Sequence, residues 1–235
     1  MQKRLVRKLD LERLLAQAKP HPSPNPALEQ YMTPTDVAAT MLYLAAYTYN
    51  DIVGKTVLDL GCGTGRLALG AAYLGAEQVV GVDLDKASVK MALEASQQTG
   101  LRSKTQWVAA DINTVRGGFD TVLQNPPFGV QRRNADRRFL EKALEVGNMV
   151  YSLHKSTHDS ETFRRRLGHS KGDVVPVSPS PFLARFIEDH GGVIVAVYAV
   201  LMSIPHMFSF HAERRHEFVA DLYVIEGKTK SSRAR

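Results

Sequence analysis

The sequence predicts an α/β fold, in which a mostly parallel sheet of seven strands, one of them antiparallel, carries helices on both faces. Between residues 55 and 155, short apolar runs alternate with helical stretches of roughly a dozen residues, the length of a crossover between parallel strands. Late in the chain, residues 217–227 alternate apolar and polar side chains, which is typical of an antiparallel strand. Together these patterns indicate a sheet that is covered on both faces.

The individual elements follow from apolar spacing and turn residues. An amphipathic helix is expected before the proline-rich connector 19–26, because apolar residues recur there at roughly helical spacing. These residues are Leu5, Val6, Leu9, Leu14, Leu15 and Ala18. A second helix is expected after residue 35. Strands are expected at 55–61, 78–85, 105–112, 119–125, 149–154, 191–205 and 217–227, and further helices at 66–75, 86–100 and 139–146.

Composition indicates one main domain with short flanking segments. Residues 1–27 are expected to form the N-terminal helix and connector, and residues 28–227 the α/β domain. Within this domain, residues 157–185 are basic and rich in proline and serine, which indicates an insertion; a solvated loop and a binding element both fit it. Residues 228–235 have the composition of a basic disordered tail.

Charge and cysteine content limit the function classes. The net charge of +6 favours polyanionic partners without excluding a merely soluble basic protein. Cys62 is the only cysteine, so no intramolecular disulfide can form, and the histidines lack metal-ligand spacing. The longest apolar run, 193–204, is too short to cross a bilayer, and no signal peptide is recognisable. We therefore expect a cytoplasmic protein with no membrane partner and no metal site.

A glycine-rich turn follows the first strand of the alternating region. The segment VLDLGCGTGRLALG places Gly61, Gly63 and Gly65 between a strand and a helix, where glycine allows a sharp turn and close approach of a ligand. The last position of the dinucleotide pattern G-x-G-x-x-G is Arg66 here, and no phosphate-binding G-x-x-x-x-G-K-[ST] is present. From this segment alone, a purely structural turn stays open.

Acidic residues lie in or after three successive strands. Asp83 follows Gly61 by about 20 positions, where an acid binds ribose in nucleoside-binding α/β folds. Asp111 can meet an adenine edge or cap a helix, and Asp59 can brace the turn or face a cationic ligand. A ribose-binding acid without a phosphate loop suits S-adenosylmethionine, a cationic nucleoside without phosphate groups.

The tetrad NPPF follows the fourth strand and is therefore expected beside the same pocket. The Asn125 side chain and the Pro126 carbonyl can accept hydrogen bonds from a planar amino group, and Pro126 and Pro127 hold the backbone rigid. Phe128 can stack on a base. The structural alternative is a proline-terminated strand with a core phenylalanine.

These motifs resemble those of known enzymes. DLGCGTG with Asp83 and Asp111 resembles the class I S-adenosylmethionine-dependent methyltransferases, which have a Rossmann-like fold, and NPPF resembles the tetrad of enzymes that methylate planar amino nitrogens. LEQYMTP at 28–34, DLGCGTGRL, NPPFG and YSLHKS at 151–156 occur in this order. Together they closely resemble the small single-domain ribosomal-RNA adenosine N6-methyltransferases, the archaeal relatives of the eukaryotic small-subunit enzyme.

The resemblance covers residues 28–156 and resumes at 186–227, so the insertion departs from the shorter eukaryotic pattern. It implies methylation of N6 of an adenosine in small-subunit ribosomal RNA, with S-adenosylmethionine as the cofactor. The tetrad, from Asn125 to Phe128, would hold the target base. The implied cofactor contacts are Gln30, Thr33, Asp59, Gly61, Gly63, Thr64, Arg66, Asp83, Asp111 and Asn125.

Basic residues near the tetrad and in the insertion are candidates for RNA contacts, which would position RNA through its phosphates. The candidates are Arg132, Arg133, His154, Lys155, Arg164, Arg165 and Arg166, with Arg137 and Arg138 adjoining the base site. Solvated charges without a role are the alternative. An adenosine has to leave its stack to enter a pocket, so the target is expected to be unpaired or flipped.

The resemblance also implies a partner, a small zinc-binding activator protein that forms a heterodimer over an apolar edge of the sheet. The strand at 105–112 would be that edge, and Trp107 belongs either to the contact or to the core. Other functions stay open. They are a DNA amino-methyltransferase, a protein glutamine methyltransferase and a catalytically silent RNA-binding assembly factor.

Overall fold

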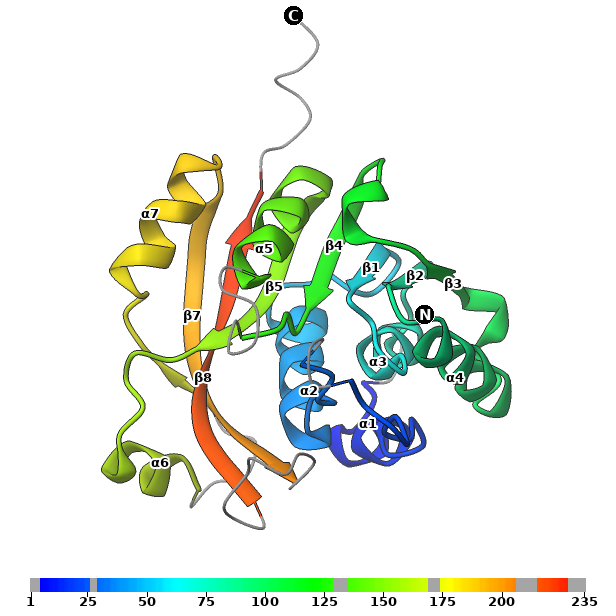
Figure 1. Ribbon diagram of the computed structural model, residues 1–235, viewed down its shortest axis with the longest axis horizontal. Coiled ribbons are helices and arrows are strands. Elements are labelled where there is room, and N and C mark those ends of the chain that lie inside the picture. Colours follow the sequence, from blue (N-terminus) through cyan, green and yellow to red (C-terminus); the bar gives the residue numbers. More distant parts are fainter. Residues whose placement is uncertain (1–4, 26–28, 129–134, 169–173, 206–214, 228–235) are drawn as a thin grey trace, which may run out of the picture.

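A single sheet forms the centre of the computed structural model, which describes residues 5–25, 29–128, 135–168, 174–205 and 215–227. Within these residues the sheet has eight strands in the order β3-β2-β1-β4-β5-β8-β7-β6 (Figure 1). Seven strands were expected. The additional one, β6 (Val175–Pro176), comes from the predicted insertion and pairs antiparallel with β7.

The predicted strands and helices are confirmed with small shifts of their ends. The strands are β1 (Thr56–Leu60), β2 (Gln78–Asp83), β3 (Thr105–Ala109), β4 (Phe119–Gln124), β5 (Gly147–Lys155), β7 (Val193–Pro205) and β8 (Arg215–Glu226). The α-helices are α1 (Lys8–Leu15), α2 (Thr35–Tyr43), α3 (Arg66–Leu74), α4 (Lys86–Gln98), α5 (Ala135–Val146), α6 (Glu161–Gly168) and α7 (Pro181–Asp189). Short turns of other helix types are η2 (Leu44–Thr48), η3 (Arg102–Lys104) and η4 (Ile112–Thr114).

Strand directions follow the predicted pattern. Strands β1 to β5 are parallel to one another, and β8 runs antiparallel to both β5 and β7. The predicted end of the insertion at residue 185 falls inside α7, so that helix joins the insertion to the rest of the domain. No helix in the described part of the chain is long and apolar enough to span a membrane.

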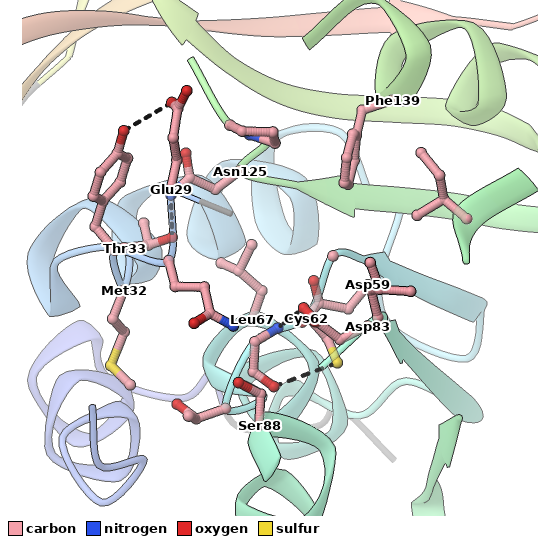
Figure 2. Close-up of a pocket in the computed structure, with 18 of the residues that line it drawn as sticks. Glu29, Met32, Thr33, Asp59, Cys62, Leu67, Asp83, Ser88, Asn125 and Phe139 are labelled. Atoms are coloured by element: carbon pink, nitrogen blue, oxygen red, sulfur yellow. Dashed lines mark hydrogen bonds between the residues drawn. The ribbon is translucent and has the colours of Figure 1, made fainter. Parts of the chain in front are cut away.

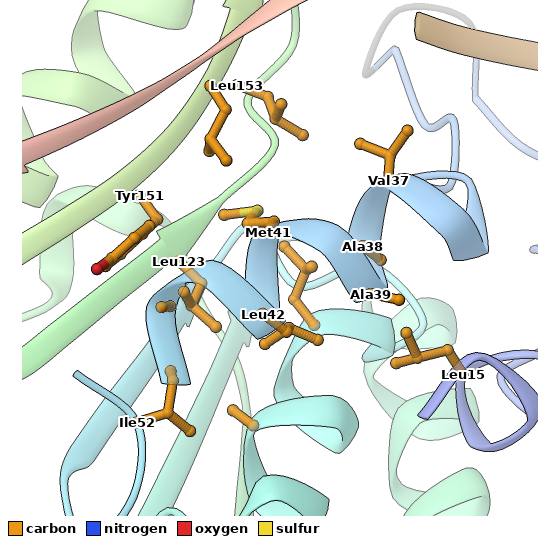
Figure 3. Close-up of a cluster of buried hydrophobic side chains, with 14 of the residues drawn as sticks. Leu15, Val37, Ala38, Ala39, Met41, Leu42, Ile52, Leu123, Tyr151 and Leu153 are labelled. Carbon is orange, nitrogen blue, oxygen red and sulfur yellow. The ribbon is translucent and has the colours of Figure 1, made fainter. Parts of the chain in front are cut away.

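Two apolar clusters hold the helices to the two faces of the sheet. On one face, Leu42 of α2 packs with Leu123 and Tyr151 of the central strands (Figure 3). On the other face, Leu140 of α5 packs with Val122 from the same strand β4. Successive residues of one strand thus point to opposite faces, which fixes the register of β4 between two cores.

The N-terminal helix buries a different set of residues from the expected one. Leu11, Leu14, Leu15 and Ala18 are buried, whereas Leu5 and Leu9 are exposed. The buried set has the spacing i, i+3, i+4, i+7 of a single helix face. Helix α1 packs closely against α3 at Gly70, where there is no room for a side chain. A Cβ atom added at Gly70 would lie 2.9 Å from Leu15. Helix α1 is therefore part of the same core as the α/β domain.

Candidate active site

A cavity of about 320 Å³ lies at the carboxyl ends of the parallel strands, within the size range of small-molecule sites. The strand order reverses between β1 and β4, and open α/β sheets bind their ligands in the crevice at such a switch point. Figure 2 shows Asp83 and Ser88 across the cavity from Asn125. The cavity thus brings together the glycine turn and the NPPF tetrad, as the sequence predicts.

The glycine turn wraps one end of the cavity. Gly61, Gly63 and Gly65 all have positive φ angles, of 75°, 52° and 87°, which favour glycine. A Cβ atom at Gly65 would lie 2.6 Å from the Trp107 ring, whereas one at Gly63 would meet no atom within 4 Å. Gly65 is therefore needed for packing, while Gly63 leaves the main chain open to a ligand.

Asp83 at the end of β2 holds this turn in place. Its Oδ2 accepts a hydrogen bond from the Gly63 amide at 2.8 Å, and its Oδ1 accepts one from the Asp85 amide at 2.9 Å. Burial raises the pKa of the Asp83 carboxyl, and hydrogen bonds from the backbone amides of Asp85, Gly63 and Leu84 oppose this rise. A carboxylate offers about four lone-pair sites, so it can still accept from a ligand in the cavity.

The other two predicted acids also line the cavity and have structural partners. Asp111 accepts a hydrogen bond from the Asn113 amide at 2.8 Å and so caps η4. Asp59 is buried and accepts a hydrogen bond from the Ala68 amide of α3 at 2.8 Å. Each acid therefore performs the bracing role considered from the sequence, and each remains in the cavity wall.

Burial raises the pKa of Asp59 from its ordinary value of 3.8 to about 7, against the hydrogen bond from Ala68. A carboxyl whose pKa is higher in the folded state costs stability as the pH rises from its ordinary pKa of 3.8 to about 7, because over this range the unfolded chain is ionised and the folded chain is not. The Asp59→Asn variant has no carboxyl to ionise. We expect the Tm of this variant, relative to wild type, to increase between about pH 4 and about pH 7 and to level off above about pH 7. Thermal unfolding measures this difference, and a difference that does not vary with pH would contradict the assignment.

The tetrad supplies an unpaired acceptor. The Asn125 Nδ2 donates a hydrogen bond to Thr33 Oγ1 at 3.0 Å. The amide oxygen Oδ1 therefore points away from Thr33. The Asn125 Oδ1 is buried and has no hydrogen-bond partner in the described part of the chain. Thr64 Oγ1 in the glycine turn is buried and unpaired in the same sense. Both residues line the cavity, so a ligand bound there can pair with these two atoms, as buried polar atoms in folded proteins nearly always are.

The rest of the tetrad is divided between the cavity and the core. Pro127 lines the cavity and Pro126 is buried beside it. Phe128 lies outside the cavity lining, stacked with Tyr31 at a centroid separation of 6.1 Å and edge-on to Phe218 at 5.4 Å. The ring that was expected to cover the base therefore belongs to an aromatic cluster at the edge of the cavity.

Gln30 and Arg66 fasten the N-terminal segment over the cavity. Gln30 accepts from the Asn25 amide at 2.7 Å and donates to Asp85 Oδ2 at 3.0 Å. Arg66 donates to the carbonyl oxygens of Thr33, Leu15 and Ala18 at 2.6, 3.2 and 3.1 Å. Both side chains line the cavity, but their polar atoms mainly bind the protein itself.

Arg66→Met is expected to loosen this segment. Burial lowers the pKa of Arg66 to about 10, so the guanidinium is still charged at neutral pH. Loss of its hydrogen bonds to three carbonyls should lower the free energy of unfolding by about 2–4 kcal/mol. Chemical denaturation and limited proteolysis of the N-terminal segment measure the change. Arg13→Met is the control, because Arg13 is an exposed residue of α1 with only a surface ion pair. Equal stability of the two variants would contradict the role of Arg66.

His154 lies in the interior instead of at the expected RNA-contacting surface. It is 2% exposed, and burial lowers its pKa to about 4, so it is neutral at physiological pH. Its Nε2 lies 2.7 Å from Ser152 Oγ, which accepts a hydrogen bond from Gln124 Nε2 at 2.9 Å. A phosphate contact through His154 is therefore wrong for this structure, because a neutral buried ring neither reaches nor attracts RNA.

The other RNA-contact candidates differ in exposure and in whether their side chains form ion pairs. Arg132 and Arg133 lie outside the described residues, and Lys155 is exposed. Arg164 is held by Asp159 at 2.7 Å, and Arg165 pairs with Glu161 at 2.6 Å on the surface of α6. Arg166 is exposed on the same helix. The structure leaves RNA binding by these residues as a prediction.

Trp107 belongs to the core, which decides between the two alternatives left open by the sequence. Its ring packs against Gly65 and Gly81, and its Nε1 donates a hydrogen bond to Ser96 Oγ at 3.2 Å. Strand β3 does form an end of the sheet, as expected. Val108, the next residue, is 42% exposed on that strand.

Sequence reasoning missed several residues of the cavity. Phe139 of α5 lines it, and a Cβ atom at Gly61 would lie 2.7 Å from that ring. Met32 and Leu84 are further apolar lining residues. Motif spacing carried no signal for Phe139 and Leu84, which folding brings to the cavity, whereas Met32 lies inside the LEQYMTP motif next to the predicted contact Thr33. No group of three or more His, Cys, Asp or Glu side chains within the described ranges could hold a metal ion.

Comparisons with known proteins identify the family. The Methyltransferase small domain family matches residues 34–151. An uncharacterized protein from Methanocaldococcus jannaschii is 34% identical over 94% of this chain and 95% of its own length. The rRNA N(6)-adenosine-methyltransferase Mettl5 from Drosophila melanogaster is 40% identical over 65% of this chain and 75% of its own length.

A solved structure gives the same result. The crystal structure of a candidate RNA methyltransferase from Pyrococcus horikoshii is 34% identical, covers 96% of this chain and 100% of that chain, and superposes with a TM-score of 0.79. The likeness thus extends over the whole sheet and not only over the glycine turn and tetrad. The chain belongs to the Methyltransferase small domain family.

Proposed function

We propose that this protein transfers a methyl group from S-adenosylmethionine to N6 of an adenosine in RNA, with small-subunit ribosomal RNA as the substrate. The observation that carries the proposal is the buried, unpaired Asn125 Oδ1, oriented by Thr33 at the wall of the cavity. The rRNA N(6)-adenosine-methyltransferases among the relatives support the choice of base and of RNA.

The cavity residues fit S-adenosylmethionine. Asp83 keeps lone pairs free for the two ribose hydroxyls, and the open main chain at Gly63 accepts close approach of the ligand. Thr64 offers an unpaired buried hydroxyl, and Asp111 lies where the adenine edge would be held. Asp59 places a carboxyl in the wall of a site for a cation, which would favour its ionised form.

The chain's own residues provide positioning and hydrogen-bond acceptors. When bound, S-adenosylmethionine supplies an electrophilic methyl group on a sulfonium. Asn125 Oδ1 and the Pro126 carbonyl accept the two N–H groups of the adenine amine, which directs the nitrogen lone pair toward the methyl. The two prolines keep both acceptors from moving during the reaction, so little reorganisation is needed. The amine becomes acidic only after it gains the methyl, so no strong base is needed, and the proton that it then releases goes to water.

The experiment is a methyl-transfer assay with radiolabelled S-adenosylmethionine. Unmodified small-subunit ribosomal RNA, DNA and ribosomal protein are offered in separate reactions, and labelled RNA is digested to nucleosides for identification. We expect label in N6-methyladenosine from RNA. Label confined to DNA or to glutamine in protein would overturn the proposal in favour of the corresponding methyltransferase. Cofactor binding without transfer to any of the three would favour a catalytically silent assembly factor.

We also propose that a small zinc-binding activator protein covers the open edge of β3. In the described part of the chain no strand pairs with the outer edge of β3, and Val108 exposes apolar surface there. An unpaired strand edge is a ready template for pairing with another chain. The same assay, run with and without such a protein from the same genome, tests this proposal. If methyl transfer does not depend on the added protein, and the two proteins elute separately on gel filtration, the proposed partner is ruled out.

A further inference from the structure

We propose that Arg137 and Phe182 form a stacking platform for a nucleobase of the substrate RNA, next to the target adenosine. This inference rests on the proposed function and adds to it a second nucleotide site, outside the cofactor and base cavity. The two residues come from the first turns of α5 and α7, two helices on the same face of the sheet.

Phe182 is an aromatic residue that the core does not use. It is 49% exposed, although its neighbours Leu183 and Ile187 on α7 are buried against the sheet. The Arg137 guanidinium carbon lies 4.3 Å from the centre of its ring. A large apolar side chain that is left half exposed under a cation has the composition of a binding surface for flat, negatively charged ligands.

Arg137 also keeps its hydrogen-bond donors available. Three other arginines near the insertion are paired with carboxylates, namely Arg164 with Asp159, Arg165 with Glu161 and Arg185 with Asp189. The Arg137 guanidinium, by contrast, donates to none of the described residues. A guanidinium with free donors over a ring can bind a phosphate at its edge while a base stacks on the pair.

The platform adjoins the base site. Ala135, Arg138 and Phe139 line the cavity from the start of α5, and Arg137 lies between them in the chain, with its guanidinium over Phe182 of α7. Residues within one turn lie at most about 5.4 Å apart along the helix axis, a distance that one nucleotide of an extended strand can span. Helices α5 and α7 are packed together, since a Cβ atom at Gly192 would lie 2.9 Å from both Leu144 and Ile187. The platform is therefore held at a constant distance from Asn125.

A nucleic acid fits this surface better than a protein. Base–aromatic stacking contributes about 1–3 kcal/mol per base and tolerates any sequence, because every base has a π face. An unpaired target adenosine leaves its neighbour unstacked as well, and the platform replaces the lost stacking partner. The ring and the guanidinium are already in contact, so little side-chain freedom is lost on binding.

The test uses a short single-stranded RNA in which the fluorescent base 2-aminopurine follows one adenosine. Wild type should quench this base on binding, because stacking quenches it. Phe182→Ala should lose the quenching and weaken RNA affinity by about 5- to 100-fold, whereas Phe182→Trp should retain both. Arg137→Ala should lower the salt dependence of binding by about one phosphate contact. Tyr73→Ala is the control, since Tyr73 is 37% exposed on α3, on the opposite face.

The outcomes separate the platform from the proposed function. Unchanged quenching and RNA affinity in Phe182→Ala, with wild type still methylating RNA, would overturn the platform alone. So would a Phe182→Ala defect that is seen only when a partner protein is present, since that would assign the surface to a protein. Wild type that methylates no RNA would overturn the proposed function and, with it, a platform for substrate RNA. Affinity for S-adenosylhomocysteine should be equal in all variants.

Discussion

Asn125→Ala is expected to reduce methyl transfer by about 10²- to 10³-fold while leaving cofactor binding nearly unchanged. The variant removes the unpaired Oδ1, which is the acceptor that aligns the amine, and the hydrogen bond that its side chain donates goes to Thr33. Its buried partner Thr33 would lose one hydrogen bond, so a modest loss of stability is expected as well. Single-turnover transfer and calorimetric titration with S-adenosylhomocysteine measure the two effects separately.

Thr33→Val provides a graded comparison for this prediction. It keeps the Asn125 amide but removes the hydroxyl that orients it, at a position that is buried and close in volume. We expect a loss of transfer of about tenfold, smaller than that of Asn125→Ala, because the acceptor is present but less well aligned. A parallel loss of cofactor affinity and of transfer in Asn125→Ala would show that Asn125 acts in cofactor binding and not on the amine.

Asp83→Ala is expected to weaken binding of S-adenosylmethionine by about 100-fold or more, because two charge-assisted hydrogen bonds to ribose would be lost. The effect includes the turn itself, since the Gly63 and Asp85 amides lose their acceptor. Calorimetric titration measures the affinity, and thermal unfolding measures the accompanying loss of stability.

Asp120→Asn is the matched control for Asp83. Its carboxylate also accepts two hydrogen bonds, from the Thr56 amide and hydroxyl at 2.8 Å, but at the start of β1 and β4, away from the cavity. Asp120→Asn should lower stability and leave cofactor affinity at the wild-type value. If both variants lose affinity to the same degree, the effect is one of folding, and Asp83 has no special role in binding.

Much of the fold could be predicted because its patterns are local. The alternation of apolar runs and helices between residues 55 and 155 can be predicted from side-chain periodicity, because helices and strands place their side chains at different fixed spacings. Gly75 ends α3 with a φ of 103°, as its position after the periodic stretch predicts. The N-terminal helix is an instructive failure. Leu5 and Leu9 fit a loose helical spacing, yet the buried face is the one that contains Leu11, and only contact with α2 and α3 selects it.

In the candidate site, too, some features could be predicted from the sequence and others only from tertiary contacts. Asp83 and Asn125 follow strands that are parallel neighbours of β1, so their meeting at one edge follows from the order of motifs in the chain. The burial of His154 does not. A histidine next to the last residue of a strand is expected at the surface, and only the pairing of β5 with β8 encloses it.

The sequence by itself thus determined the α/β class, the glycine turn and the tetrad, because each depends on residue types at fixed spacing along one segment. Tertiary structure alone decided that Trp107 packs inside, that Arg66 ties the N-terminal segment down, and that Arg137 lies on Phe182. The contacts of Trp107 with Gly65, of Arg66 with Thr33 and of Arg137 with Phe182 join residues that are 42, 33 and 45 positions apart in the chain. Periodicity carries no information over such distances, because packing between elements, and not local backbone preference, selects the partner.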